Sequence, residues 1–475
     1  MNHGILTSAS AGNWGNGTTG LLNNYSPWAL TFAAATIDRK FVTKVHLGDK
    51  EVYVGVSINA FDLNGTLYPL VYSVDGLAIG HDGNESRYYM IGSLNDTNQV
   101  TGKIVFTDHL NSWMRATDVG AIGIVMHAKG PLDYGDTYSL PASLLYNRDG
   151  NQILSCINST SDPTTTIDKS IEIIDKAASS IVSFSSRGPN PITVDILKPD
   201  LSAPGVEILA AWSEATTVMG YVGDKRSSSY VKSFNPTWSP SAIKSALMTT
   251  DFLKSFHQSY FLILNMIKKH KDISSYSKII SAEKDIDAEF AYGSGQINPL
   301  KAVTPSLVYD IEEKDFVSFL CRQTYNITSL RLITGDSIIS CSKDNNSSVW
   351  DLNYPSFTLS APSGHVARVF HRTVTNVANV GSTYKATIIA PPQLSVQVNS
   401  TILTFESTGQ KQSFTMKVKA HIAKNITSGS LVRDDGVHQV RSPVVAHSFE
   451  SRRKDDYTGS FLKGGFSYKG FHPSS

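Results

Sequence analysis

The sequence predicts an α/β protein with a compact α/β module, buried strands joined by tight turns and a C-terminal β-sandwich. Apolar runs broken by glycine and proline, as in residues 178–212, are typical of buried strands joined by tight turns. Strand and helix patterns alternate over residues 66–175, which indicates a compact α/β module. Between Trp350 and Val445 only strand patterns occur, separated by turn residues, and this spacing indicates the sandwich.

Composition and charge are those of an ordinary globular protein. The chain has 475 residues, enough for about two to four domains. Hydrophobic residues make up 41% and charged residues 17%, which argues against disorder. The formal net charge of +1 gives no electrostatic reason to expect a nucleic-acid or membrane partner. No apolar stretch reaches the length of about 18 residues that a membrane span needs.

The first elements are expected to be strands. Residues 4–12 and 29–37 are rich in small, branched and apolar side chains, and each predicts a short strand. Residues 40–48 and 51–58 alternate in polarity around a Gly-Asp-Lys turn, so they predict a hairpin.

The strongest helix signal begins at Ser239 and Pro240. Serine is a preferred N-cap, and proline fits the first helical position because its φ angle is already helical. Ile243, Ala246 and Leu247 then recur at helical spacing and form one buried face.

Two segments differ in composition from the rest of the chain. Residues 251–283 are rich in Phe, Ile, Lys and Tyr and contain no glycine or proline, so we interpret them as an atypical insert. Residues 447–475 are polar, basic and glycine-rich, and we expect them to form a disordered tail.

The three cysteines, Cys156, Cys321 and Cys341, are too few for a disulfide scaffold. Cys321 and Cys341 flank a short polar segment. They either close one loop in an oxidising compartment or remain free thiols, and the sequence leaves both possibilities open. Cys156 then has no partner.

Asn-X-Ser/Thr sequons are dense in this chain. They begin at Asn16, Asn24, Asn64, Asn84, Asn95, Asn158, Asn326, Asn345, Asn346, Asn399 and Asn425. Such a density favours a secreted glycoprotein. The first residues contain neither a charged region nor an apolar region of a signal peptide. We therefore expect a secreted protein whose beginning is not included in this sequence.

Several long motifs carry a family resemblance. They read SAGNWG, VSFSSRGPNPITVDILKPDLSAPGVEILAAW, WSPSAIKSALMTT, FAYGSGQINPLKAV and WDLNYPSF. In this order they resemble the plant subtilisin-like serine proteases of the cucumisin type, over most of residues 4–250 and 287–446. The resemblance is specific because long runs correspond, but it is incomplete.

The resemblance implies a subtilisin-like α/β domain with an incomplete parallel sheet, an inserted protease-associated module and a fibronectin type III-like β-sandwich. The expected parts are catalytic fragments 1–45 and 176–305, the protease-associated domain 46–175, a connector 306–349, the sandwich 350–446 and the tail 447–475.

Asn13 is the one candidate site residue. In the motif SAGNWG it matches the asparagine that donates to the oxyanion in the family. A donor of this kind stabilises the charge that develops in the tetrahedral intermediate. From spacing alone, Asn13 is better explained as a turn residue, because asparagine and glycine favour turns. The family resemblance instead favours descent from an oxyanion donor.

The triad of the family is not found in this sequence. A serine nucleophile needs a histidine to take its proton and a carboxylate to orient that histidine. The Asp and His motifs of the family belong before the point where this sequence starts, and no Asp-Thr-Gly, Asp-Ser-Gly or His-Gly-Thr occurs in it. His3 and the run His81-Asp82-Gly83 stand in other contexts and are interpreted as surface residues.

The nucleophile is expected in a Gly-Thr-Ser turn that opens a helix. At the corresponding place the chain reads GDKRSSSYVKSF, with no glycine directly before Ser227, Ser228 or Ser229 and no apolar helix after them. We interpret these serines as a polar junction from which the nucleophile segment is missing.

The sequence thus predicts a serine endopeptidase by descent, whose ancestral reaction is peptide-bond hydrolysis through an acyl-enzyme, and predicts that this chain is inactive. Two alternatives stay open: a non-catalytic binding or decoy protein, and a non-functional product of a mis-spliced gene or pseudogene. We expect no cofactor and no metal. The resemblance implies a protein or peptide substrate, no nucleic-acid or membrane partner, and an extracellular location in the apoplast or cell wall.

Overall fold

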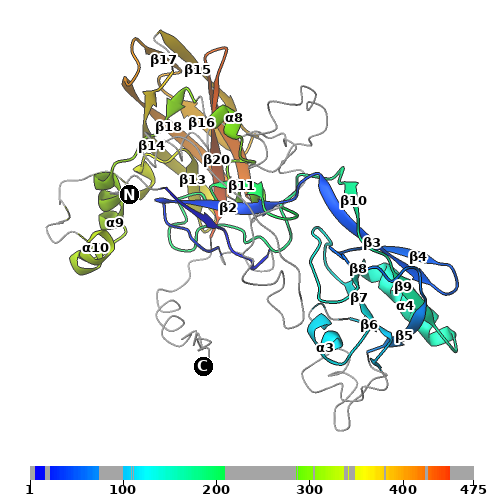
Figure 1. The fold of residues 1–475 in the computed structure, drawn as a ribbon. Coiled ribbons are helices and arrows are strands. Elements are labelled where there is room, and N and C mark those ends of the chain that lie inside the picture. The colour runs from blue at the N-terminus through cyan, green and yellow to red at the C-terminus, as the bar shows by residue number, and fades with distance from the viewer. Residues whose placement is uncertain are drawn as a thin grey trace.

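The computed structural model describes residues 6–15, 22–73, 100–108, 110, 112–208, 285, 287–302, 305–335, 341, 348–378, 381–422 and 426–449. They form a three-stranded sheet, an eight-stranded sheet and a two-sheet sandwich (Figure 1). The predicted helix at Ser239, the insert 251–283 and all but the first three residues of the expected tail lie outside this part of the chain.

The three-stranded sheet is parallel and has β2 at its centre. Its strands are β1 (Thr7–Ser10), β2 (Ala29–Ala35) and β11 (Leu201–Pro204), in the order β1-β2-β11. Nearly every residue of β2 is buried, as expected for a strand that is covered on both faces. The first two predicted strands are therefore confirmed.

The buried strands predicted within residues 178–212 are confirmed at β11, but residues 178–191 form no strand. Only an isolated bridge between Ala35 and Ile181 forms there, and the rest of the segment is irregular although it is largely buried. Arg187 explains how this backbone avoids a sheet, because its guanidinium donates to the carbonyls of Val182 (3.2 Å) and Ser185 (2.6 Å). Buried backbone groups are thus satisfied by a side chain.

The eight-stranded sheet forms a barrel. Its strands are β3 (Arg39–Leu47), β4 (Val52–Val56), β5 (Tyr68–Tyr72), β6 (Ile104–Thr107), β7 (Gly123–Ala128), β8 (Ala142–Tyr146), β9 (Thr164–Ile167) and β10 (Ile171–Ile174). The order is β10-β3-β4-β8-β7-β6-β5-β9, and β9 also pairs with β3, which closes the sheet. The predicted hairpin is confirmed as β3–β4, and the expected boundary between residues 45 and 46 falls inside β3.

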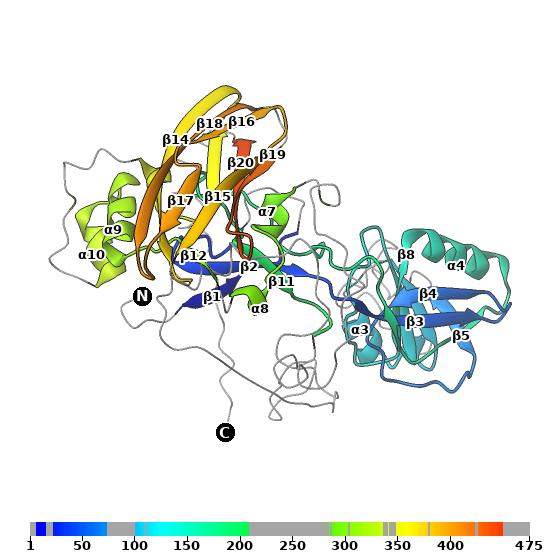
Figure 2. The same ribbon diagram turned by 90° about the horizontal axis from the view of Figure 1, so that it is seen from above.

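Among the described residues of the barrel, two helices are found, α3 (Trp113–Asp118) and α4 (Asn147–Ser159). The buried side chains of β6 and β7, such as Phe106 and Val125, fill the barrel core together with Ile153 from α4. Figure 2 shows the barrel set apart from the sandwich, with the three-stranded sheet between them.

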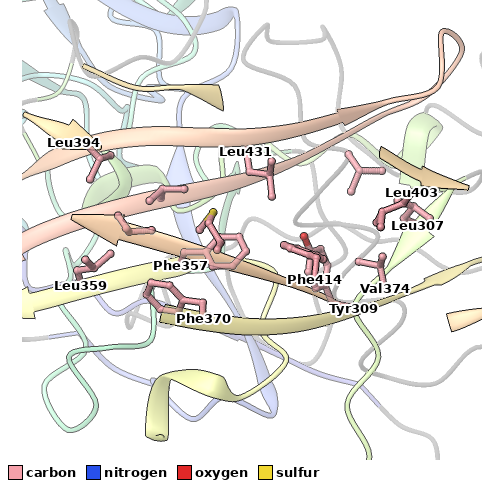
Figure 3. Packing of buried hydrophobic residues seen from close by; sticks show 14 of the residues in the cluster. Leu307, Tyr309, Phe357, Leu359, Phe370, Val374, Leu394, Leu403, Phe414 and Leu431 are labelled. Atoms are coloured by element: carbon pink, nitrogen blue, oxygen red, sulfur yellow. The ribbon is translucent and has the colours of Figure 1, made fainter. Parts of the chain in front are cut away.

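The C-terminal sandwich is confirmed. One sheet contains β12 (Leu307–Val308), β14 (Gly364–Asn376), β18 (Lys411–Ile422) and β16 (Leu394–Val398) in that order. The other contains β13 (Phe357–Ala361), β20 (Gln439–Ser448), β19 (Thr427–Asp434), β15 (Ser382–Ile389) and β17 (Ile402–Phe405). Phe357, Phe370 and Phe414 lie in the core between the sheets (Figure 3).

The sandwich extends beyond its expected limits at both ends. β12 lies in the segment expected to be a connector and pairs with β14. β20 continues through His447 and Ser448, so these two residues are ordered strand and not disordered tail. The reason is burial: His447 is 2% exposed and its ring packs edge-on against Phe290.

Short helices connect the sheets. They are α7 (Glu289–Tyr292), α8 (Pro299–Ala302), α9 (Glu313–Arg322), α10 (Ile327–Thr334) and the 3₁₀ turn η1 (Val349–Asp351). A disulfide joins Cys321 at the end of α9 to Cys341, which decides between the two possibilities that the sequence left open. Cys156 on α4 is a free thiol. Among the helices in the described ranges, none has the length and apolar character to cross a bilayer.

Candidate functional site

Asn13 lies in a sharp loop directly after β1. Gly12 adopts a φ of +108°, and a Cβ at this position would lie 2.8 Å from Ser186 Oγ, so both conformation and space require glycine. Asn13 itself is exposed, and the neighbouring Trp14 is 60% exposed. The loop therefore presents a carboxamide to solvent at the end of a buried strand.

The loop is held in place by the irregular segment around Ser186. The Ser186 N–H donates to Gly12 O (2.8 Å), and the Gly15 N–H donates to Phe184 O (2.7 Å). The Trp14 N–H also donates to Ser186 Oγ (3.1 Å). These three bonds fix the backbone on both sides of Asn13, which is the kind of support that a preorganised donor needs.

The barrel supports the same segment from the other side. Asp133, in the loop between β7 and β8, accepts hydrogen bonds from the Ser183 N–H (2.6 Å) and the Ser183 hydroxyl (3.0 Å). Tyr134 packs edge-on against Phe184, with ring centroids 5.0 Å apart. The barrel thus positions the segment that positions the Asn13 loop.

The residues that were compared with the family's triad and rejected are not placed by the structure. Ser227, Ser228 and Ser229 lie outside the described residues, as do His3 and the run His81-Asp82-Gly83. Of the candidates, only Asn13 can be located. Within the described ranges, no group of three or more His, Cys, Asp or Glu side chains is arranged to hold a metal ion.

A buried acid–imidazole pair in the barrel was missed by sequence reasoning. His127 Nε2 on β7 lies 2.8 Å from Asp108 Oδ1, which directly follows β6, and their side chains are only 6% and 8% exposed. The His127 ring stacks on Phe106 and lies against Gly150, where a Cβ would come within 2.5 Å of the ring. This tight enclosure indicates a structural pair. The signal in the sequence was a polar residue at the end of each of two adjacent parallel strands.

A cavity of about 630 Å³ lies between α9 and the strands β14 and β18 of the sandwich. Its lining includes Asp310, Glu312, Lys314, Arg322, Asp351 and His371. His371 Nδ1 lies 3.0 Å from Asp351 Oδ1, so these two side chains of the lining already pair with each other. The mixture of acids and bases gives the cavity no preference for a ligand of either sign.

Comparison with known proteins shows similarity both for the sandwich and for nearly the whole chain. A model of the fibronectin type-III domain matches residues 351–446, which correspond to the sandwich. The subtilisin-like proteases SBT4.3 and SBT4.12 of Arabidopsis thaliana are each 37% identical to this chain, and the alignments include 95% and 94% of it. The chain belongs to the plant subtilisin-like protease family. A third such protease, SBT4.6, is likewise 37% identical over 470 residues.

This subtilisin-like chain spans 61% and 60% of the length of the first two relatives. Likeness to solved structures is local and weak. The VesB protease of Vibrio cholerae, for example, aligns with 20% of the chain at 20% identity and a TM-score of 0.15, too low to support any functional argument.

Proposed function

We propose that this chain is a subtilisin-like scaffold that does not hydrolyse peptide bonds. The observation that carries the proposal is internal to the sequence. Between Gly223 and Tyr230 the chain reads Gly-Asp-Lys-Arg-Ser-Ser-Ser-Tyr, where the family resemblance calls for a Gly-Thr-Ser turn that opens a helix. The alignment with SBT4.3 includes 95% of the chain, so family sequence stands on both sides of this junction.

The chemical reason is that acyl transfer needs a nucleophile, a base, a carboxylate and oxyanion donors that act together. A serine hydroxyl becomes a nucleophile only beside a base that is itself oriented by a carboxylate, and oxyanion donors act on the intermediate that this attack creates. Asn13 is a suitable donor because it is exposed and its backbone is fixed on both sides. Without an activated hydroxyl, such a donor has no intermediate to stabilise.

The same proposal assigns roles to the barrel and the sandwich. The barrel of residues 39–174 would be the protease-associated module, and the family points to protein or peptide partners and to an extracellular location. The barrel and the sandwich each enclose their own buried cores, so each can offer a folded binding surface without catalysis. This favours a non-catalytic binding or decoy role as the second candidate.

A fluorophosphonate probe tests the loss of hydrolysis, because it labels only activated serines. The purified chain is incubated with the probe beside an active subtilisin-like relative, and labelling is followed by mass spectrometry. We expect a labelled relative and an unlabelled chain. Labelling of any serine, or cleavage of casein that Asn13→Ala reduces by about 100-fold or more, overturns the proposal.

A mixing experiment tests the second candidate. The chain is added at increasing concentration to the active relative, and the rate of casein cleavage is measured. A decoy lowers this rate in a saturable way, whereas an unchanged rate argues against binding to a protease.

A further inference from the structure

The outer face of one sandwich sheet carries a row of lysine and histidine side chains. Along β18, every second side chain points away from the core, and Lys417, Lys419 and His421 are all exposed. On the neighbouring strand β14, His365 is exposed and stands directly across from His421, with ring centroids 4.5 Å apart. We call these four residues the lysine–histidine face.

Polar side chains border this row on its other side. On β16, Ser395 stands across from Lys419 and Gln397 across from Lys417, and both are exposed. Because alternate residues of a strand are about 7 Å apart, the side chains of Lys417 and Lys419 leave β18 about that far apart. A hydroxyl and a carboxamide lie beside them at the same spacing.

Among the described residues, the lysines and histidines of this face have no acidic partner. In the described part of the chain, no ion pair is formed by Lys417, Lys419, His365 or His421. The end of the same sheet near α9 differs, because there His371 pairs with Asp351, and Glu312 lies close enough to Lys411 to be influenced by its charge. Acids therefore pair with basic side chains elsewhere in this sheet, whereas none of the described acids forms an ion pair with the lysine–histidine face.

Protection of a sheet edge does not explain the lysines. Lysine is common on edge strands, where it prevents pairing with other chains. β18 is an interior strand with β14 on one side and β16 on the other. Like charges on one strand face repel each other, so placing Lys417 and Lys419 side by side is unfavourable for folding. This arrangement suggests that the two lysines bind a partner of opposite charge.

We propose that the lysine–histidine face binds a linear anionic polysaccharide through its carboxylates. The two ammonium groups can pair with successive carboxylates of such a chain, and Ser395 and Gln397 can exchange hydrogen bonds with sugar hydroxyls. No Phe, Tyr or Trp projects from this face among the described residues of β14, β16 and β18, so it lacks the stacking platform that single-stranded nucleic acids use. With a net charge of +1, the protein as a whole does not attract polyanions, and binding depends on this local row.

The test uses the full chain and polygalacturonate as the probe, with neutral galactan as the uncharged comparison. Binding is measured by microscale thermophoresis for the wild type, for the double variant Lys417→Gln/Lys419→Gln, and for the matched control Lys176→Gln/Lys385→Gln. The control removes the same charge from exposed lysines elsewhere. Circular dichroism verifies that all three proteins are folded.

We expect the wild type and the control to bind polygalacturonate, the face variant to bind about tenfold or more weakly, and binding to weaken as salt rises. Galactan should not bind. The proposal is overturned if the wild type does not bind, if both double variants lose affinity equally, or if single-stranded RNA or anionic lipid vesicles bind as tightly through the same lysines. None of these outcomes depends on whether the chain hydrolyses peptides.

Discussion

Lys198 Nζ lies 2.6 Å from Asp200 Oδ2, and neither side chain is exposed to solvent. The ammonium also donates to Ala29 O (2.8 Å) and Thr31 Oγ1 (2.9 Å) on β2. Asp200 accepts in addition from the Thr31 N–H (2.7 Å) and from the hydroxyl of Tyr354. A single buried ion pair therefore connects the three-stranded sheet to the segment that leads into the sandwich.

Asp200→Asn should be strongly destabilising. The substitution leaves the Lys198 ammonium buried without a counter-charge, and breaking a buried pair from one side costs about 3–5 kcal/mol of unfolding free energy. The loss is measured by guanidinium denaturation followed by tryptophan fluorescence. The apolar double variant Lys198→Met/Asp200→Leu should cost less, because it leaves no unpaired charge. A double variant as unstable as Asp200→Asn would contradict this account.

Glu289 should make stability depend on pH. Burial raises the pKa of its carboxyl above the ordinary value of 4.5, and this outweighs the opposing effects of Ser428 and Arg441. The folded state then binds a proton at a higher pH than the unfolded state, so stability should rise as pH falls through the raised pKa towards 4.5. Glu289→Gln, which mimics the protonated form, should remove this increase.

The measurement for Glu289 is the difference in denaturation midpoint between wild type and Glu289→Gln from about pH 4.5 to 7.5. Exposed Glu313→Gln is the control for the loss of one carboxylate. A wild type that loses stability relative to Glu289→Gln on acidification would show the opposite sign and refute the prediction.

Reduction of the Cys321–Cys341 disulfide should loosen the connector. The bond closes a loop with a sequence separation of 20 residues, for which chain entropy predicts a contribution of about 3 kcal/mol. We expect Cys321→Ser/Cys341→Ser to lower the melting temperature and to abolish its sensitivity to dithiothreitol. Cys156→Ser should change neither, and non-reducing peptide mapping should show the 321–341 peptide pair. Free thiols at both positions would refute the bond.

Gly12→Ala should disturb the Asn13 loop. The φ of +108° and the close approach of Ser186 Oγ together make a side chain unfavourable, with an expected cost of about 1–3 kcal/mol in thermal or chemical denaturation. Gly65→Ala is a matched control, because Gly65 also has a positive φ of +69° but a Cβ at that position would meet no atom within 4 Å. A cost no greater than that of the control would mean that the loop is not held by Ser186.

Asn64 should carry a glycan when the chain passes through a secretory pathway. The sequon Asn64-Gly65-Thr66 is exposed in the turn before β5. Asn64→Gln and Thr66→Ala should therefore each remove one glycan mass from the intact protein, as measured by mass spectrometry. A mass unchanged by both substitutions would exclude modification at this site.

Periodicity and local composition account for the elements that could be predicted. The strands β1 and β2, the β3–β4 hairpin and the strands of the sandwich were recognisable because the side chains of a strand alternate between two environments. The Asn13 loop was recognisable for a local reason as well, since Gly12 has a backbone conformation that favours glycine. Residues 178–191 show where such prediction fails. Their apolar character reflects the burial of irregular backbone that is held by Arg187, not a strand.

The sequence alone determined the family, the β-sandwich, the position of Asn13 and the missing Gly-Thr-Ser motif, because each of these depends on residues adjacent along the chain. Only the tertiary structure decided that Cys321 bonds Cys341, that β9 closes the barrel on β3, and that Lys198 and Asp200 meet Tyr354, which is 154 residues beyond Asp200. It also decided that His365 joins the lysines of β18 on one surface. Such pairings depend on the register of distant strands, and that register is settled by packing of the whole core.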